Sequence, residues 1–195
     1  AFFGLMYFAA LRPEEAVNVR ASNLTLPSSD GWGEIHLHEA TPHAGSEWTD
    51  DGRARDQRQL KGRARGERRT VPATPELTEL LKQHIDEFGT GEGGRLFRGT
   101  RTEELPKITY IRAWKAARLL AFTEEVAASP LAATPYALRH ACVSTWLNGG
   151  VPATQVAEWA GHSVEVLLKV YAKCLDGQDE VARRRVLDAL GHHAS

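Results

Sequence analysis

The sequence is poor in the features that mark several specialised protein classes. It has only two cysteines, Cys142 and Cys174, which fit no metal-binding spacing and no disulfide scaffold. Its apolar opening, residues 1–11, is shorter than the roughly 20 residues that span a membrane. That opening also lacks the flanks of a signal peptide. These absences predict a cytoplasmic protein with no metal site and no contact with a membrane.

The chain also lacks an excess of charge of either sign. Its 24 Lys and Arg residues balance 25 Asp and Glu residues, so the total charge does not indicate a nucleic-acid-binding protein. One segment departs from this balance, because residues 53–69 carry eight basic and two acidic side chains. A positive face attracts phosphate over about one Debye length, roughly 8 Å in physiological salt. The segment therefore predicts a contact with DNA.

The hydrophobic pattern predicts a mainly helical α+β fold with a small antiparallel sheet of three strands. Residues 34–38 alternate with the period of a strand. Two more short strands, 57–61 and 69–72, are expected on either side of a basic turn, and the polar residues 41–56 indicate a loop. Helices are expected at about 2–10, 13–20, from 75 onward, 108–121, 134–149, 152–161, 163–171 and 178–190.

Several side chains suited to phosphate chemistry are spread along the chain. Arg12 and Arg139 offer guanidiniums, whose planar fork stays charged and grips two oxygens at once. The phenol of Tyr171 can bond covalently to phosphorus, but its ordinary pKa of about 10 requires a base or a cationic surrounding. Lys61 lies in the basic segment and can protonate a leaving oxygen. These are the parts needed to break a DNA phosphodiester without a metal.

Four motifs stand in a fixed order along the chain; two contain Arg12 and Arg139, Lys61 precedes the second motif, and Tyr171 follows the last. They are A-L-R-P-E-E at 10–15, R-T-V-P at 69–72, Y-A-L-R-H at 136–140 and G-H-S at 161–163, with a tyrosine nine residues after the histidine. This order resembles the catalytic domain of the tyrosine recombinase, or phage integrase, family over nearly the whole chain. The resemblance implies the catalytic fold of that family.

The resemblance also implies a role for each residue. Arg12 and Arg139 are expected to hold the scissile phosphate, with help from His162. Tyr171 is expected to attack it and form a 3′-phosphotyrosyl intermediate, while Lys61 protonates the leaving 5′ oxygen. The implied protein is a site-specific DNA recombinase or integrase of a mobile element that needs no cofactor.

Tyr136 departs from the family pattern, which has a histidine at this position. A phenol is a poor proton acceptor near neutral pH, so the identity of the base is open. Tyr136, Arg139 and His140 stand at i, i+3 and i+4, and therefore project together from the start of one helix, whose free N–H groups attract phosphate. The residues expected to bind DNA are Arg63, Arg65, Arg68, Arg69 and His140.

Further expectations concern domains and assembly. Residues 1–195 are expected to form a single catalytic domain, incomplete at its N-terminus, without the upstream DNA-clamp domain of the family. The resemblance implies a homotetramer on two synapsed double-stranded DNA sites. The segment 172–195 is then exchanged between subunits.

Other interpretations stay open. Tyr171 has the helical spacing of a core residue, and Arg12 has an acidic partner within reach at Glu15. Arg63 and Arg65 are neighbours of Lys61 and compete with it for the role of general acid. A type IB topoisomerase-like enzyme has the same chemistry, although the G-H-S link favours a recombinase. A DNA-binding remnant of an integrase that no longer cuts is the other alternative.

Overall fold

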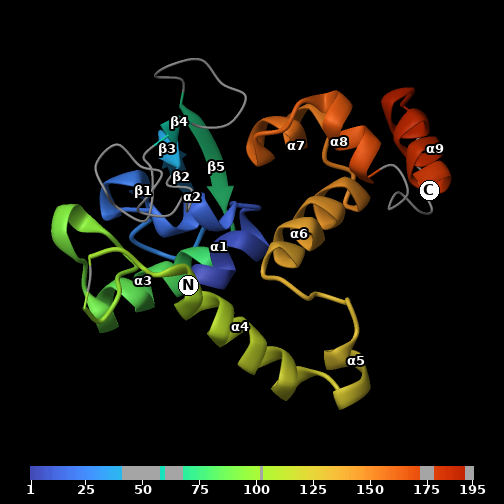
Figure 1. Cartoon of the computed structure of the whole chain (residues 1–195). Coiled ribbons are helices and arrows are strands. Elements are labelled where there is room, and N and C mark those ends of the chain that lie inside the picture. Colours follow the sequence, from blue (N-terminus) through green and yellow to red (C-terminus); the bar gives the residue numbers. More distant parts are fainter. Residues whose placement is uncertain (41–57, 60–67, 102, 172–177, 192–195) are drawn as a thin grey trace.

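The computed structural model describes residues 1–40, 58–59, 68–101, 103–171 and 178–191, and the structural statements below refer to these residues. Helices make up most of this part and a small antiparallel sheet packs beside them, which confirms the predicted α+β class (Figure 1). The α-helices are α1 (Phe2–Phe8), α2 (Pro13–Val17), α3 (Pro75–Phe88), α4 (Lys107–Ala121), α5 (Glu124–Ala128), α6 (Tyr136–Asn148), α7 (Ala153–Ala160), α8 (Val164–Tyr171) and α9 (Gln178–Ala189), with 3-10 turns η1 (Ala21–Asn23) and η3 (Glu92–Gly94).

The main sheet has the strand order β1–β2–β5, with both outer strands antiparallel to β2. Ile35 pairs with Val71, and Leu37 pairs with Arg69. Alternate residues of β2 and β5 are buried, as expected for a sheet with one covered face. The strands are β1 (Leu24–Thr25), β2 (Gly33–Leu37), β3 (Glu39–Ala40), β4 (Arg58–Gln59) and β5 (Arg69–Ala73).

Within the described residues, the two strands expected on either side of the basic turn pair with other strands. The segment expected at 57–61 contributes β4, which pairs with β3, whereas β5 pairs with β2. Strands β2 and β5 match because Ile35 and Val71 bury their side chains on the same face. Residues 60–67 and 41–57 lie outside the described residues.

Two apolar clusters hold the elements together. The larger joins α1, α2, the main sheet and α3, and includes the fully buried Leu5, Ile35 and Leu77. The smaller joins α6, α7 and α8, and includes Leu167. Full burial of one such side chain contributes about 1.5–3 kcal/mol. Ala10 belongs to the smaller cluster although it follows α1, so the turn between α1 and α2 lies where the clusters meet.

Two helices end earlier than predicted, and both ends have a structural cause. α1 ends at Phe8, and Ala10 then takes a left-handed φ of 51° that no helix continues through. α2 ends at Val17 instead of about Arg20. Arg20 pairs with Arg95 in an antiparallel bridge, and this extended backbone excludes a helix.

The connection between α7 and α8 follows the sequence prediction. Gly161 ends α7 with a left-handed φ of 64°, a conformation that glycine adopts without a steric penalty. The Oγ of Ser163 then accepts a hydrogen bond from the Val166 N–H at 3.2 Å and caps the start of α8. A three-residue link thus places His162 between the two helices.

Helix α9 lies on the α6–α8 side of the molecule, away from the main sheet (Figure 1). Its Arg185 lies against Gly150 at the end of α6, because a Cβ on that glycine would come within 1.8 Å of the Arg185 Nη2. Val186, Leu187 and Leu190 are exposed. No described helix is both long and apolar enough to cross a membrane.

Candidate active site

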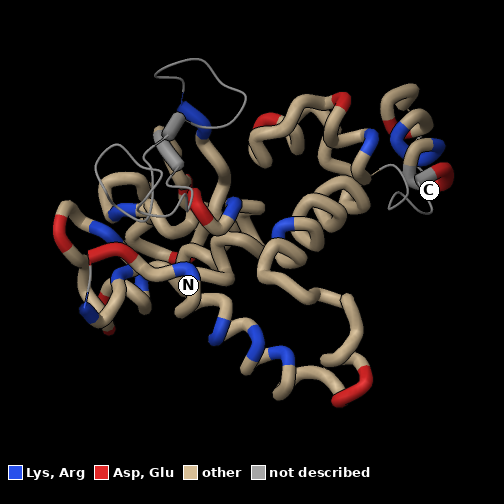
Figure 2. The backbone as a smooth tube through the Cα atoms, in the orientation of Figure 1, with Lys and Arg blue, Asp and Glu red and all other residues tan. Residues whose placement is uncertain are grey.

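Three buried arginines from separate motifs gather around one carboxylate, that of Glu15. Arg12 Nη1 donates to Oε1 at 2.9 Å. Arg69 donates through Nη1 to Oε1 at 2.9 Å and through Nη2 to Oε2 at 2.7 Å. Arg139 Nη1 lies 4.0 Å from Oε2. Figure 2 marks in blue the Lys and Arg positions along the backbone, among them those before α2, at the start of β5 and in α6. Arg12 and Arg139 therefore converge, as the sequence motifs predict.

The first arginine is positioned by local chain chemistry. Arg12 is the N-cap of α2, and the Glu15 carboxylate accepts from the Arg12 backbone N–H at 2.8 Å. Pro13 occupies the first helical position, where its missing N–H costs nothing. The three-residue spacing of the motif therefore forms a capping box that also fixes the Arg12 guanidinium.

Arg69 is placed differently from the DNA-binding role expected of it. Its side chain is 1% exposed and both of its terminal nitrogens are bonded to Glu15. The pairing of β5 with β2 turns Arg69 inward opposite Leu37, whereas its neighbour Arg68 is exposed. Of the adjacent pair, Arg68 is the one placed to meet a ligand in solution. The structure thus gives Arg69 a supporting role that the sequence reasoning missed.

The cluster carries more positive than negative charge. Burial by itself raises the pKa of Glu15, but Arg69, Arg12 and Arg139 outweigh it and lower that pKa to about 2. One carboxylate thus stays ionised beside three guanidiniums. Burial and the nearby Arg12 lower the pKa of Arg139. This lowering shows that the positive charge of Arg139 is incompletely compensated by its surroundings. A buried cationic excess of this kind favours binding of a further anion.

Arg139 connects the two clusters of the fold. It is fully buried; its Nη1 donates to the Ala10 carbonyl and its Nη2 donates to the Ala160 carbonyl. Nη2 also lies 2.8 Å from Nε2 of His162. Its Nε is buried without a hydrogen-bond partner among the described residues. The α1–α2 turn and the end of α7 are therefore both held by one guanidinium.

His162 faces the arginines in its neutral form. Burial, followed by the charges of Arg139 and Arg12, lowers its pKa to about 4. Since Nε2 accepts from Arg139, the ring proton of the neutral form lies on Nδ1, which is buried and has no bonded partner in the described part. The His162 and Tyr171 rings are stacked, with centroids 6.4 Å apart. His162 therefore links the arginines to the tyrosine.

Gly161 is a site residue whose role the sequence did not reveal. Its carbonyl accepts from Arg12 Nη2 at 2.8 Å. A Cβ at this position would lie 2.1 Å from Arg69 Nη1 and 3.4 Å from Arg12 Nη1. Both the left-handed backbone and the packing of the arginines therefore require glycine. The one signal in the sequence was the position of Gly161 at an expected helix end, where glycine often adopts a left-handed conformation.

Tyr171 lies within the smaller core cluster and also at the site. It is 2% exposed, and its hydroxyl lies 2.7 Å from Nδ1 of His140. The Tyr136 ring packs edge-on against His140 with centroids 5.0 Å apart, and the Arg139 guanidinium carbon lies 5.9 Å from the centre of the Tyr136 ring. His140 thus contacts the candidate nucleophile, a contact that the DNA-binding expectation did not include.

Some predicted residues lie outside the described part. Lys61, Arg63 and Arg65 are among them, so the general acid and the basic turn remain predictions from the sequence. Within the described residues, no three His, Cys, Asp or Glu side chains form a group that could hold a metal ion.

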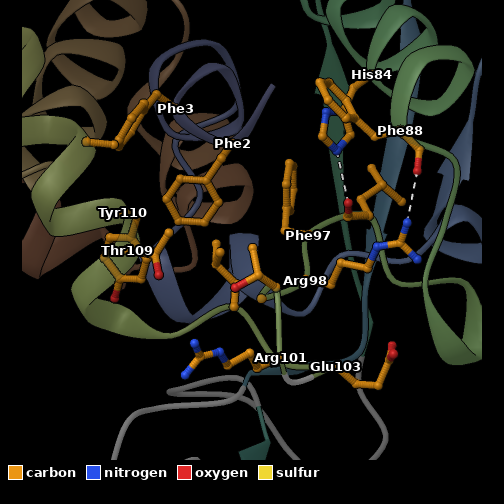
Figure 3. Close-up of a pocket in the computed structure, with 15 residues that line it drawn as sticks. Phe2, Phe3, His84, Phe88, Phe97, Arg98, Arg101, Glu103, Thr109 and Tyr110 are labelled. Carbon is orange, nitrogen blue, oxygen red and sulfur yellow. Dashed lines mark hydrogen bonds between the residues drawn. The ribbon is translucent and has the colours of Figure 1, made fainter.

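An open aromatic cavity of about 900 Å³ lies elsewhere, between α1, α3 and α4 (Figure 3). Phe2, Phe97 and Tyr110 line it, and Arg98 is turned away to donate to the Phe88 carbonyl at 3.2 Å. None of the predicted site residues lines this cavity. The predicted site is therefore separate from this cavity.

The fold and its arginine–histidine–tyrosine site define a protein of the tyrosine recombinase class. The sequence profile of the phage integrase family matches residues 1–177, and the chain belongs to this family. This confirms the resemblance seen in the sequence motifs. A search of the curated proteins found no match.

Solved structures support the same fold. The Tn1549 transposon integrase in complex with a circular intermediate DNA matches with a TM-score of 0.68 and 16% identity, over 94% of this chain and 56% of that one. XerH site-specific recombinase bound to a difH substrate matches with a TM-score of 0.59 and 17% identity, over 86% of this chain and 41% of that one. The catalytic domain of bacteriophage HP1 integrase matches with a TM-score of 0.54 and 18% identity, over 94% and 79%. This chain thus spans little more than half of the transposon integrase.

Proposed function

We propose that this chain is the catalytic domain of a site-specific DNA recombinase that cleaves and rejoins DNA through a 3′-phosphotyrosyl intermediate at Tyr171. One observation carries the proposal. Arg12 and Arg139, from distant motifs, surround a common carboxylate, and His162 joins Arg139 to the ring of Tyr171. Membership of the phage integrase family supports the same activity.

The charge of the cluster suits the transition state of this reaction. A phosphodiester carries one negative charge, and attack by a phenolate raises it to two on the oxygens around phosphorus. Three guanidiniums and one carboxylate leave an excess of two positive charges. Fixed cations that match developing charge stabilise the transition state more than the bound substrate. The arginines thus account for catalysis as well as binding.

In the structure, backbone carbonyls occupy arginine donors that a phosphate needs. Arg139 donates to the carbonyl of Ala160, and Arg12 donates to that of Gly161. These two consecutive carbonyls lie at the end of α7, beside the adjustable link to α8. We infer that phosphate oxygens replace them when DNA binds, with a small shift of this link.

The reaction then proceeds by in-line exchange at phosphorus. The Tyr171 hydroxyl loses its proton to a base, its oxygen bonds to phosphorus, the bond to the 5′ oxygen breaks, and Lys61 supplies the proton that the 5′ oxygen takes up. Attack by a 5′ hydroxyl of a partner strand reverses these steps and completes strand exchange. The side chains of this chain perform every step.

The assembly follows from the same proposal. The partner is double-stranded DNA in the cytoplasm, and four copies act on two synapsed sites. Residues 1–195 form the catalytic domain. The exposed apolar residues Val186, Leu187 and Leu190 make the 172–195 segment suitable for exchange with a neighbouring subunit.

Trapping of a covalent adduct tests the function. Since the DNA site is unknown, the probe is a pool of randomised duplexes with 5′-bridging phosphorothiolate links, whose thiol product does not religate efficiently. The full-length protein should form an adduct that mass spectrometry maps to Tyr171. Tyr171→Phe should abolish it, and Tyr7→Phe, at an exposed site on α1, should not. No adduct from the wild type would support the non-cutting alternative, and rapid relaxation of supercoiled DNA without exchange would support a topoisomerase.

A further inference from the structure

We propose that His140 is the general base that accepts the phenolic proton of Tyr171, in place of the family histidine whose position Tyr136 occupies. The inference rests on the proposed function. Its structural basis is the contact of 2.7 Å between Nδ1 of His140, on α6, and the hydroxyl of Tyr171, at the end of α8. A heavy-atom distance of about 2.6–3.2 Å is the first requirement for a general base.

The neighbouring side chains are less suited to this task. Nε2 of His162 is engaged by Arg139 at 2.8 Å, and its ring centroid lies 6.4 Å from that of Tyr171. Tyr136 offers a phenol, which is a poor proton acceptor near neutral pH. Its ring instead packs edge-on against His140 with centroids 5.0 Å apart, so Tyr136 orients the imidazole. The tyrosine in the family motif is therefore a positioning residue for the histidine one helical turn later.

The surroundings of His140 keep its lone pair available. Tyr136 and Arg139 face it from its own helix, and Tyr171, on whose ring His162 stacks, faces it from α8. Burial, followed by the charge of Arg139, lowers its pKa below the ordinary value of 6.5. The neutral form thus dominates at neutral pH, with Nδ1 as acceptor and the proton on Nε2. Because His140 is exposed overall, a captured proton can pass to solvent.

The proton balance closes in both directions. In cleavage, the O–H bond of Tyr171 breaks, its proton moves to Nδ1 of His140, and the new bond joins the tyrosine oxygen to phosphorus. The bond to the 5′ oxygen breaks as that oxygen takes a proton from the general acid. In rejoining, a 5′ hydroxyl loses its proton to the acid's conjugate base, and His140 returns its proton to the departing phenolate.

A bridging-sulfur substrate isolates this step. A thiolate leaves without a proton donor, so the rate of adduct formation with 5′-bridging phosphorothiolate duplexes reports activation of the nucleophile. His140→Gln keeps a hydrogen-bonding side chain but no base, and should slow single-turnover adduct formation by about 10²-fold or more. Tyr136→Phe keeps the packing ring but loses the hydroxyl, and a loss as large as that of His140→Gln would contradict the proposal. His36→Gln, on the sheet, is the matched histidine control and should leave the rate unchanged.

The pH profile separates a base from a structural residue. The wild-type rate should fall with acidification below the lowered His140 pKa, and His140→Gln should lose this limb. An unchanged acid limb in His140→Gln would overturn the proposal. A faster reaction in that variant would also overturn it, because it would show that His140 restrains the nucleophile. No adduct from the wild type would instead refute the proposed function.

A measurement without DNA guards against a variant that misfolds. In ¹⁵N-labelled wild-type protein, long-range imidazole spectra should show His140 with its proton on Nε2 and an accepting Nδ1. The Nδ1 signal should move in Tyr171→Phe, which removes the hydroxyl and keeps the ring. A proton on Nδ1, or no response to Tyr171→Phe, would contradict the proposal whatever the outcome with DNA.

Discussion

Arg69 binds Glu15 through both ends of its guanidinium, with Nη1 2.9 Å from Oε1 and Nη2 2.7 Å from Oε2. The two residues are 54 positions apart, on β5 and α2, and both are 1% exposed. The same carboxylate accepts from Arg12. The sheet therefore fixes the Glu15 carboxylate, which in turn fixes the Arg12 guanidinium. The geometry of Arg12 thus depends on Arg69, a residue that does not reach solvent.

Glu15→Gln should lower the free energy of unfolding at neutral pH by about 3–5 kcal/mol, because it leaves buried guanidiniums without their counter-ion. Urea denaturation at pH 7 measures this loss. Glu14→Gln, at the adjacent position of the same helix, is the matched control and should change stability much less. Equal losses in the two variants would contradict the central role of Glu15.

The pH dependence of stability provides a second test of Glu15. Its folded pKa of about 2 lies below the unfolded value of 4.5, so the unfolded state binds the proton first on acidification. The stabilisation is therefore complete above about pH 4.5 and is lost as the pH falls toward 2. It amounts to something on the order of 3 kcal/mol. Between about pH 5 and about pH 3, the free energy of unfolding should fall less steeply in Glu15→Gln than in the wild type, as measured by denaturation curves.

Arg69→Ala should mainly lower stability, whereas Arg68→Ala should mainly weaken DNA binding. Removal of Arg69 leaves Glu15 under-compensated in the interior and should cost about 3–5 kcal/mol of unfolding free energy. Removal of the exposed Arg68 should cost less stability, weaken DNA binding, and reduce the slope of log affinity against log salt by about one. Calorimetry and salt-dependent anisotropy measure the two effects. Weak destabilisation by Arg69→Ala would argue against its buried pairing.

Gly161→Ala should disturb the arginines themselves. The new Cβ meets Arg69 Nη1 at 2.1 Å, and the backbone has a φ of 64°. Gly191→Ala is the control, since its φ is 77° and a Cβ there meets nothing within 4 Å. Both should lose about 1–2 kcal/mol from backbone strain, and only Gly161→Ala should also abolish adduct formation. Retained cleavage in Gly161→Ala would show that the clamp tolerates displacement of these guanidiniums.

His162 should make stability pH-dependent in a different window. Its folded pKa of about 4 lies below the ordinary 6.5, so the unfolded state binds more protons between these values. The free energy of unfolding should therefore fall as the pH drops from 6.5 toward 4, and His162→Gln should remove part of that slope. Thermal melts across this range provide the measurement. The same slope in His162→Gln and wild type would mean that the ring is not held neutral by the arginines.

Local chemistry explains why much of the site was visible in the sequence. Arg12 and Glu15 are three residues apart and meet within one helical turn, so their pairing needs no tertiary contact. Gly161 and Ser163 end one helix and start the next by backbone conformation and capping alone. The order of the four motifs, with the tyrosine nine residues after His162, pointed to the family that the sequence profile confirms.

The orientation of the adjacent arginines could not be read in this way. A strand sends successive side chains to opposite faces, so one of Arg68 and Arg69 must point inward, but the choice depends on register. The register comes from β2, about 30 residues earlier, where Leu37 pairs with Arg69. Basic composition favoured a DNA contact for both. The buried carboxylate of Glu15 made the inward position favourable for Arg69.

The sequence by itself determined the family, the predominance of helices, and the residues that supply cations and a phenol, because these follow from short-range spacing and residue type. Only the tertiary structure decided which side chains contact one another. Three guanidiniums gather around one carboxylate, and His140 contacts Tyr171, 31 positions later in the chain. Those contacts arise when α6, α7 and α8 pack against the turn before α2, since the burial of apolar side chains from both clusters brings the motifs together.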